Sequence, residues 1–221
     1  MKLILYGATG MVGQGVLREC LLDGDVDQVL SVGRSGVEQQ HRKLRELVLP
    51  DLSNYIGHEN EFAGYDACFF CLGVSAAGMT EADYRRVTCD YTLAAAETLV
   101  KLNPGMTFIY VSGAGTDSTE QGRIMWARVK GKTENALLRL PFKAVYLFRP
   151  AGIRPLHGIT SRTRAYRIFY MLAWPFLPFL TRAFPAFMTT TERIGRAMLK
   201  AARAGAPRAV LESRGINDLG A

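Results

Sequence analysis

Short apolar runs separated by helical patterns recur along the first 150 residues. The first run, Leu3 to Tyr6, precedes a glycine-rich turn and then Val12, Val16 and Cys20 at helical spacing, which predicts strand, loop and helix. Similar runs follow in QVLSVGR, LRELVLPDL, DACFFCLG, MTFIYVSG and KAVYLFRP. Buried runs that alternate with helices indicate a parallel sheet covered on both faces, so the chain is expected to form a doubly wound α/β fold.

The clearest helix is predicted over Thr80 to Val100. Thr80 with Asp83 resembles a capping box, and the residues that follow repeat near the helical period. The expected buried stripe is Tyr84, Val87, Tyr91, Ala94 and Thr98. Only about nine polar residues separate SVGRS from LRELVLP, so a loop or one short turn is expected there. No repeat or linker divides the chain, and residues 1–221 are expected to form a single domain.

The segment GATGMVG lies between the first predicted strand and the first predicted helix. Gly7 lets the chain turn off the strand, Gly10 lets the backbone approach a pyrophosphate, and Gly13 permits close packing of helix on strand. The helix N-terminus adds backbone amides and a positive dipole. This context predicts a dinucleotide site. The other loop residues expected to contact the cofactor are Thr9, Met11 and Val12.

Cofactor preference is predicted from the end of the second strand. A carboxylate there would bind the ribose 2′-hydroxyl of NAD, but this chain has Arg34. An arginine can pair with a 2′-phosphate, so NADP(H) is favoured over NAD(H). Further cofactor contacts are expected at Asp51 and Leu52 after the third strand and at Leu72 and Gly73 after the fourth.

In chain order, the segments GATGMVG, VGRS, PDL, CLG, YVSGAG, VKGKTE and FRPAGI resemble the atypical short-chain dehydrogenase/reductase superfamily, and most closely its Tat-interacting-protein-like branch. The resemblance covers roughly residues 1–155. It implies a Rossmann-like sheet that binds NAD(P) at the carboxyl ends of its strands, with Pro150 near the nicotinamide. It also implies a catalytic serine after the fifth strand and a YxxxK pair on the next helix. Ser112 matches the serine and Lys130 the lysine, but Trp126 occupies the tyrosine position.

The tryptophan removes the usual proton donor. Trp126 and Lys130 share a helix face, but an indole N–H only donates a hydrogen bond and cannot cycle a proton. Three interpretations remain. Another group donates the proton, or Ser112, Lys130 and the nicotinamide charge stabilise an oxyanion without it, or the protein binds NADP(H) without turnover. Lys130 is also explained as a ribose contact alone. The candidate donors are Ser112, Thr116, Asp117, Tyr166 and Tyr170.

Charge is distributed unevenly: residues 1–122 hold 9 Lys+Arg and 16 Asp+Glu, and residues 123–221 hold 18 and 4. Within the basic half, Ile168 to Leu180 carries no charge, while Pro175 and Pro178 argue against a membrane-spanning helix. Residues 154–190 are expected to form a small C-terminal lid or interface region of the domain. The run either packs against the body or a second subunit in a homodimer, covers an apolar substrate, or contacts an anionic membrane weakly.

The four cysteines are too few and too irregular for a disulfide framework, and a strand-like run begins at residue 1. A cytoplasmic protein is therefore expected, with peripheral membrane contact as the alternative. Cys68 and Cys71 form a CxxC inside a predicted strand, which favours core cysteines over a metal site. His157 is a candidate substrate contact, and the basic half has no nucleic-acid-binding motif.

These features predict an NADP(H)-binding oxidoreductase, or an epimerase-like enzyme, that acts on a small apolar carbonyl or alcohol with a non-standard proton donor. The alternative is a non-catalytic NADP(H)-sensing or scaffold protein. The substrate itself is not encoded in any motif of the sequence.

Overall fold

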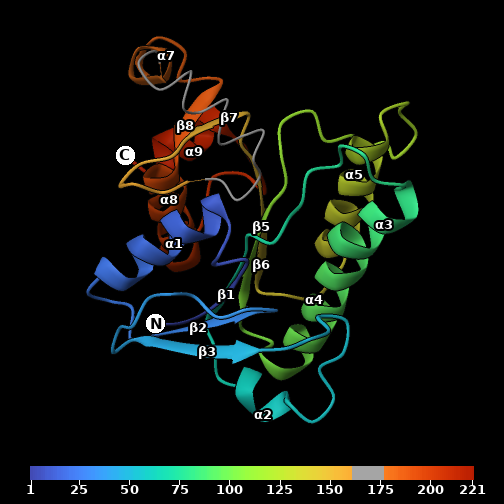
Figure 1. The fold of residues 1–221 in the computed structure, drawn as a ribbon, viewed down its shortest axis with the longest axis vertical. Coiled ribbons are helices and arrows are strands. Elements are labelled where there is room, and N and C mark those ends of the chain that lie inside the picture. The colour runs from blue at the N-terminus through green and yellow to red at the C-terminus, as the bar shows by residue number, and fades with distance from the viewer. Residues whose placement is uncertain (161–176) are drawn as a thin grey trace.

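The computed structural model describes residues 1–160 and 177–221 (Figure 1). Within these residues, seven parallel strands form one sheet in the order β3-β2-β1-β4-β5-β6-β9. Their bounds are β1 Lys2–Tyr6, β2 Gln28–Gly33, β3 Leu44–Val48, β4 Ala67–Phe70, β5 Thr107–Val111, β6 Ala144–Arg149 and β9 Val210–Glu212. The predicted doubly wound α/β fold is confirmed.

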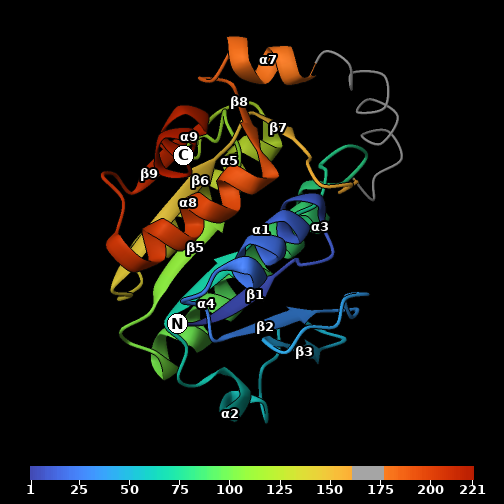
Figure 2. The ribbon, with the colours of Figure 1, turned by 90° about the vertical axis from the view of Figure 1, so that its left-hand side faces the viewer.

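The central strands are buried on both faces, as expected for a parallel sheet between two helical layers. All residues of β4 and β5 are buried, and so are four of the five residues of β1. One face packs against α1 (Met11–Leu22), α8 (Thr191–Ala204) and α9 (Ser213–Leu219). The other packs against α2 (Glu59–Phe62), α4 (Tyr91–Leu102) and α5 (Met125–Leu138). Figures 1 and 2 show α1 and α8 side by side on one layer.

The strand order reverses beside β1. From β1 the chain builds β2 and β3 outward on one side, and then returns to place β4 on the other. In open parallel sheets the carboxyl ends of the strands leave a crevice at such a reversal, and ligands bind there. This crevice therefore lies above β1 and β4.

The helix predicted over Thr80 to Val100 is interrupted by a wide turn. It consists of α3 (Glu81–Arg85), the π-helical segment η1 (Arg86–Asp90) and α4. The Thr80 side chain caps α3 by accepting a hydrogen bond from the Asp83 backbone N–H at 3.2 Å. The predicted Tyr91 is buried, whereas the predicted Ala94 and Thr98 are half-buried and the stripe beyond Tyr91 lies one position further along. The buried residues of α4 are Tyr91, Thr92, Ala95, Ala96, Leu99 and Val100. A π-helical turn holds extra residues and so changes the register of the helix that follows it.

The segment between β2 and β3 contains no helix, as predicted, and Cys68 is a buried core residue of β4. Beyond β6, two short strands, β7 (Gly152–Arg154) and β8 (Met188–Thr190), form a separate parallel pair. Helix α7 (Leu177–Ala183) precedes β8 and includes Pro178.

Two sequence-based hypotheses concern residues that the structure does not describe. Most of the apolar run Ile168 to Leu180, and the candidate donors Tyr166 and Tyr170, lie within residues 161–176, outside the described part. Among the described helices, none has the length and apolar character needed to cross a membrane.

Candidate functional site

The carboxyl ends of four neighbouring strands bring the predicted site segments to one edge of the sheet. Gly7 follows β1, Leu72 lies two residues after β4, Ser112 follows β5 and Pro150 follows β6. Backbone hydrogen bonds tie the last two segments together, because Ser112 N–H donates to the Phe148 carbonyl at 2.8 Å and Ala114 N–H donates to the Pro150 carbonyl at 3.0 Å. Residues distant in sequence therefore meet at one edge of the sheet.

The glycine loop is folded too tightly for larger residues. Gly7 has a φ of 78°, a conformation that favours glycine, and a Cβ there would lie 2.6 Å from the Leu72 nitrogen. A Cβ on Gly13 would lie 2.0 Å from the Gly7 carbonyl oxygen. Helix α1 begins just after Gly10, and no side chain caps its N-terminus. Its first amides and the positive end of its dipole are therefore available to an anion.

A cavity of about 760 Å³ opens beside this loop. Its walls come from the glycine loop, α1, the segment after β2 and the segment after β7. The lining residues include Ala8, Thr9, Gln14, Arg18, Val37 and Ile159. Arg34 is exposed directly after β2, on the chain segment that leads to Val37. The cavity and the loop together offer room for part of a dinucleotide.

The remaining predicted cofactor contacts lie in different surroundings. The Asp51 carboxylate accepts hydrogen bonds from the Ser53 backbone N–H at 2.9 Å and from its hydroxyl at 2.7 Å, and these bonds lower the pKa of Asp51. The Leu52 side chain is 1% exposed and packs in the core. Leu72 is half-buried and Gly73 exposed, at the crevice edge. Asp51 therefore holds a tight turn, and the Leu52 side chain belongs to the core.

Ser112 contacts an acidic residue that the sequence motifs did not reveal. Its hydroxyl donates to Oε1 of Glu134, which lies on α5 and is 1% exposed. Arg149 of β6 pairs with the same carboxylate: its Nε lies 3.0 Å from Oε1 and 3.1 Å from Oε2, and its Nη2 also donates to Oε2. This pairing raises the pKa of Arg149. The site thus contains a buried Ser–Glu–Arg chain.

Glu134 carried a weak signal in the sequence. It is the last residue of VKGKTE and follows Lys130 by four positions, the spacing of a helical ion pair. Its contact with Ser112 depends on how β5 packs against α5, which local spacing does not specify. Neither Glu134 nor Arg149 was predicted as a site residue.

Lys130 lies one helical turn before Glu134 and is half-buried. Its Nζ lies 5.5 Å from the centroid of the Tyr110 ring, a cation–π arrangement. Burial lowers the pKa of Lys130 from 10.5 to about 8, and the nearby Glu134 carboxylate partly opposes that shift. The Lys130 ammonium is therefore a stronger acid than that of an exposed lysine.

Trp126 is an aromatic packing residue at the position of the expected tyrosine. It is half-buried against a small cluster that contains Tyr84, Cys89 and Val129. A Cβ placed on Gly115 would lie 3.4 Å from the edge of its indole ring, so the ring borders the loop after β5. Trp126 shapes one wall near the site but carries no exchangeable acid.

Two of the candidate proton donors have other partners. The Thr116 hydroxyl donates to the Gly113 carbonyl at 2.7 Å. The Asp117 carboxylate accepts from the Thr119 hydroxyl at 2.6 Å and from the Gly122 backbone N–H at 2.7 Å, and these bonds lower its pKa. Asp117 is thus a loop-forming carboxylate. Of the described candidates, Ser112 has the most direct link to a proton acceptor.

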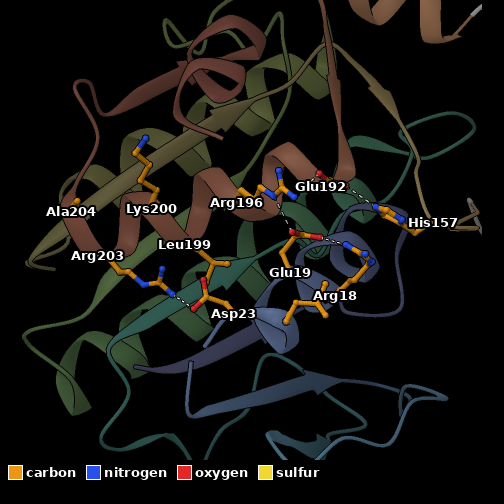
Figure 3. A pocket seen from close by; sticks show the side chains of 11 residues that line it. Arg18, Glu19, Asp23, His157, Glu192, Arg196, Leu199, Lys200, Arg203 and Ala204 are labelled. Carbon is orange, nitrogen blue, oxygen red and sulfur yellow. Dashed lines mark hydrogen bonds and ion pairs between the residues drawn. The ribbon is translucent and has the colours of Figure 1, made fainter. Parts of the chain in front are cut away.

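A second cavity, of about 660 Å³, runs between α1 and α8 (Figure 3). An ion pair bridges its walls: the buried Glu19 carboxylate of α1 pairs at 3.3 Å with Arg196 of α8, and it also pairs with Arg18 on its own helix. His157 Nε2 lies 2.7 Å from a carboxylate oxygen of Glu192. His157, a predicted substrate contact, therefore lies beside both cavities and is paired across to α8.

The strand order and the glycine loop define a Rossmann-like α/β fold. No family model matches the chain. WbmF from Bordetella bronchiseptica, solved in complex with NAD+, is 16% identical and superposes with a TM-score of 0.68 over 99% of this chain and 76% of that one. A short-chain dehydrogenase/reductase from Burkholderia thailandensis is 14% identical, with a TM-score of 0.67 over 98% and 92% of the two chains.

A UDP-glucose 4-epimerase from Thermotoga maritima is 15% identical, with a TM-score of 0.65 over 96% of this chain and 76% of that one. Among curated proteins, the chain is similar to the mitochondrial protein FMP52-2 of Scheffersomyces stipitis, with 28% identity over 149 residues. That alignment includes 66% of this chain, and the chain spans 63% of the relative's length. These likenesses establish the fold. The Tat-interacting-protein-like branch stays a prediction.

Proposed function

We propose that the protein binds NADP(H) in the crevice above β1 and β4 and transfers hydride between this cofactor and a small apolar alcohol or carbonyl. The observation that carries the proposal is the position of the glycine loop and Ser112 at one edge of the sheet, with Lys130 Nζ 5.5 Å from the ring of Tyr110, in the strand that Ser112 follows. WbmF and the related WbmH, which share the fold, were each solved with NAD+.

The residues present fit a dinucleotide. At Gly7 and Gly13 the loop packs so closely that a Cβ would clash with backbone atoms, which leaves the amides at the start of α1 open to a pyrophosphate. The exposed Arg34 follows β2, where a 2′-phosphate would lie, and no carboxylate occupies its position. These features support NADP(H) over NAD(H).

Lys130 and Ser112 would act on different parts of the bound molecules. A lysine ammonium whose pKa is about 8 is still mostly charged at neutral pH, so Lys130 can bind the nicotinamide ribose and favour negative charge on the substrate oxygen. Ser112 would contact that oxygen directly. When bound, the nicotinamide supplies or accepts the hydride.

The second candidate function is non-catalytic nucleotide sensing. The observation that favours it is Trp126, which replaces a group able to exchange a proton with one that only donates a hydrogen bond. In this function Lys130 would still hold the ribose, and Ser112 with Glu134 would be structural. The two candidates predict the same cofactor affinity and differ in turnover.

Turnover separates these candidates. NADPH oxidation over a panel of apolar ketones, and NADP+ reduction over the matched alcohols, would be followed for wild type, Lys130→Ala and Trp126→Tyr. We expect measurable turnover by wild type and a loss of about 100-fold in Lys130→Ala, in the range for one positioned catalytic group. Lys132→Ala, an exposed lysine on the same helix, is the matched control and should stay within twofold, as the order of effect for a surface site. Turnover that appears only in Trp126→Tyr, at unchanged nucleotide affinity, would refute the enzyme proposal.

A further inference from the structure

In the buried chain of Ser112, Glu134 and Arg149, the hydrogen bonds run in one direction, because both Ser112 and Arg149 donate to the Glu134 carboxylate. Glu134 is 1% exposed, and Arg149, whose side chain is 12% exposed, binds both of its carboxylate oxygens. A buried charge of this kind is retained only when it is paired and hydrogen-bonded, and the arginine meets that requirement. An ion-paired carboxylate accepts hydrogen bonds and donates none.

Ser112 therefore has its single hydroxyl proton committed to Glu134. Its neighbour Thr116 lies 3.5 Å from Ser112 Oγ, but the Thr116 proton has a shorter partner in the Gly113 carbonyl, at 2.7 Å. The oxygen of the half-buried Ser112 thus has no close hydrogen-bond donor among the described residues and keeps lone-pair capacity for a ligand. A group that offers lone pairs binds a hydroxyl, which has a proton to donate, better than it binds a carbonyl.

We infer that Glu134 is the proton acceptor of this site, reached through Ser112, and that the site is built to oxidise an alcohol. This inference rests on the proposed function. Trp126 cannot exchange a proton with the substrate, and the inference gives this role to Glu134, on the same helix two turns further along.

The step balances with an oxidised nicotinamide dinucleotide as the hydride acceptor. The carbinol C–H bond breaks and its electron pair leaves with the hydrogen to the nicotinamide. The O–H bond of the alcohol breaks, its proton passes to Ser112 Oγ, and the former Ser112 proton passes to Glu134 Oε1, while the carbonyl double bond forms. After the product leaves, the proton returns through Ser112 to water in the emptied crevice.

The geometry can be tested without turnover. Carbon-13 NMR of the glutamate carboxyl groups would be recorded for wild type, Ser112→Ala and Thr116→Val, with the Glu134 resonance assigned by its loss in Glu134→Gln. We expect Ser112→Ala to shift this resonance and Thr116→Val, a variant of similar shape, to leave it in place. An unchanged resonance in Ser112→Ala would remove the hydrogen bond on which the relay depends.

The relay itself is tested by alcohol oxidation with NADP+. Glu134→Gln keeps the shape of the side chain but is not a base, and we expect kcat to fall about 100-fold or more with KM and NADP+ affinity within about twofold. Glu134→Asp should restore part of the rate. Ser112→Ala leaves the ion pair intact, so it tests the same relay if Glu134→Gln does not fold. The matched control is Glu81→Gln, which removes an exposed carboxylate paired with Arg128 on α5 at 2.7 Å.

The outcomes separate the two proposals. If wild type oxidises the alcohols and both Ser112→Ala and Glu134→Gln stay within threefold of it, the relay is wrong, and so is the contact between Ser112 and the substrate oxygen, while the proposed hydride transfer with NADP(H) stands. If wild type transfers no hydride in either direction while binding the nucleotide, the proposed function fails and the relay fails with it. A loss confined to the relay variants supports both.

Discussion

The burial of Lys130 changes both its pKa and the stability of the folded protein. Burial lowers its pKa from 10.5 to about 8. In the absence of nucleotide, the folded protein holds this proton less tightly than the unfolded chain. The charged lysine therefore costs stability below about pH 8, and the cost disappears as the pH rises toward 10.5. A bound anion beside Lys130 would favour its charged form and so offset this cost in stability.

Lys130→Met should therefore raise the free energy of unfolding at pH 7, by on the order of 2 kcal/mol. One pKa unit corresponds to about 1.4 kcal/mol, and the full pKa shift of Lys130 is discounted because its side chain is only half-buried. The gain should shrink at pH 10, where wild type no longer has to hold the charge. Urea unfolding at both pH values, without nucleotide, measures it. Lys132→Met is the control and should show neither effect. A gain that is the same at both pH values would contradict the assigned cause.

The residues that the sequence could predict are those whose role is local. Gly7, Gly10 and Gly13 are recognised because a strand, a turn and a helix follow each other within a dozen residues. Ser112 and Lys130 entered through motif resemblance; Ser112 follows β5, and Lys130 of α5 lies against Tyr110 of the same strand. Glu134 and Arg149 form their contact across 15 residues and two elements, so no local pattern reveals it. Leu52 was expected to contact the cofactor after the third strand, and its side chain lies in the core.

At the scale of elements, the close packing of α1 against α8 holds the glycine-loop helix in place. Two glycines permit this approach: a Cβ on Gly15 would lie 2.5 Å from Cβ of Thr191, and one on Gly195 would lie 2.7 Å from Cγ of Glu19. Ion pairs from Arg18 and Arg196 to Glu19 follow the same interface (Figure 3). Helix α8, far along the chain, thus packs behind the helix that follows the glycine loop.

Gly195→Ala should push α8 away from α1 and destabilise the fold by about 1–3 kcal/mol, the usual cost of overpacking a filled interface. It should also weaken NADPH binding, because α1 presents its N-terminus to the pyrophosphate. Urea unfolding and calorimetric titration measure the two effects. Gly105→Ala, at a glycine with no atom within 4 Å of the added Cβ, is the control. Unchanged stability of Gly195→Ala would show that α8 does not constrain α1.

The elements differ in how well their sequence predicted them. Strands β1, β2, β4, β5 and β6 are mostly apolar runs, and they lie where those runs predict. The π-helical turn Arg86–Asp90 was missed, because the helical period on either side of it is regular and only the register changes. Strands β7, β8 and β9 have three residues each, too short for a periodic signal, and pairing alone defines them.

For the whole molecule, the topology and the charge distribution agree on one ligand-binding edge. The acidic N-terminal half supplies the glycine loop, and the basic half supplies Lys130 and Arg149 from the opposite side of the strand-order reversal. A dinucleotide in the crevice would contact both halves. Anions bound there would also be attracted by the net positive charge of +7.

The central claim is that this crevice binds NADP(H) in preference to NAD(H), and calorimetric titration of the full chain tests it most directly. NADPH and NADH would be titrated into wild type, Arg34→Ala and, as a control, Arg208→Ala, an exposed arginine before β9. We predict that NADPH binds wild type at least about tenfold more tightly than NADH, which corresponds to about 1.4 kcal/mol. Arg34→Ala should remove this difference and Arg208→Ala should keep it. Equal affinities for the two nucleotides in wild type, or no binding of either, would contradict the account.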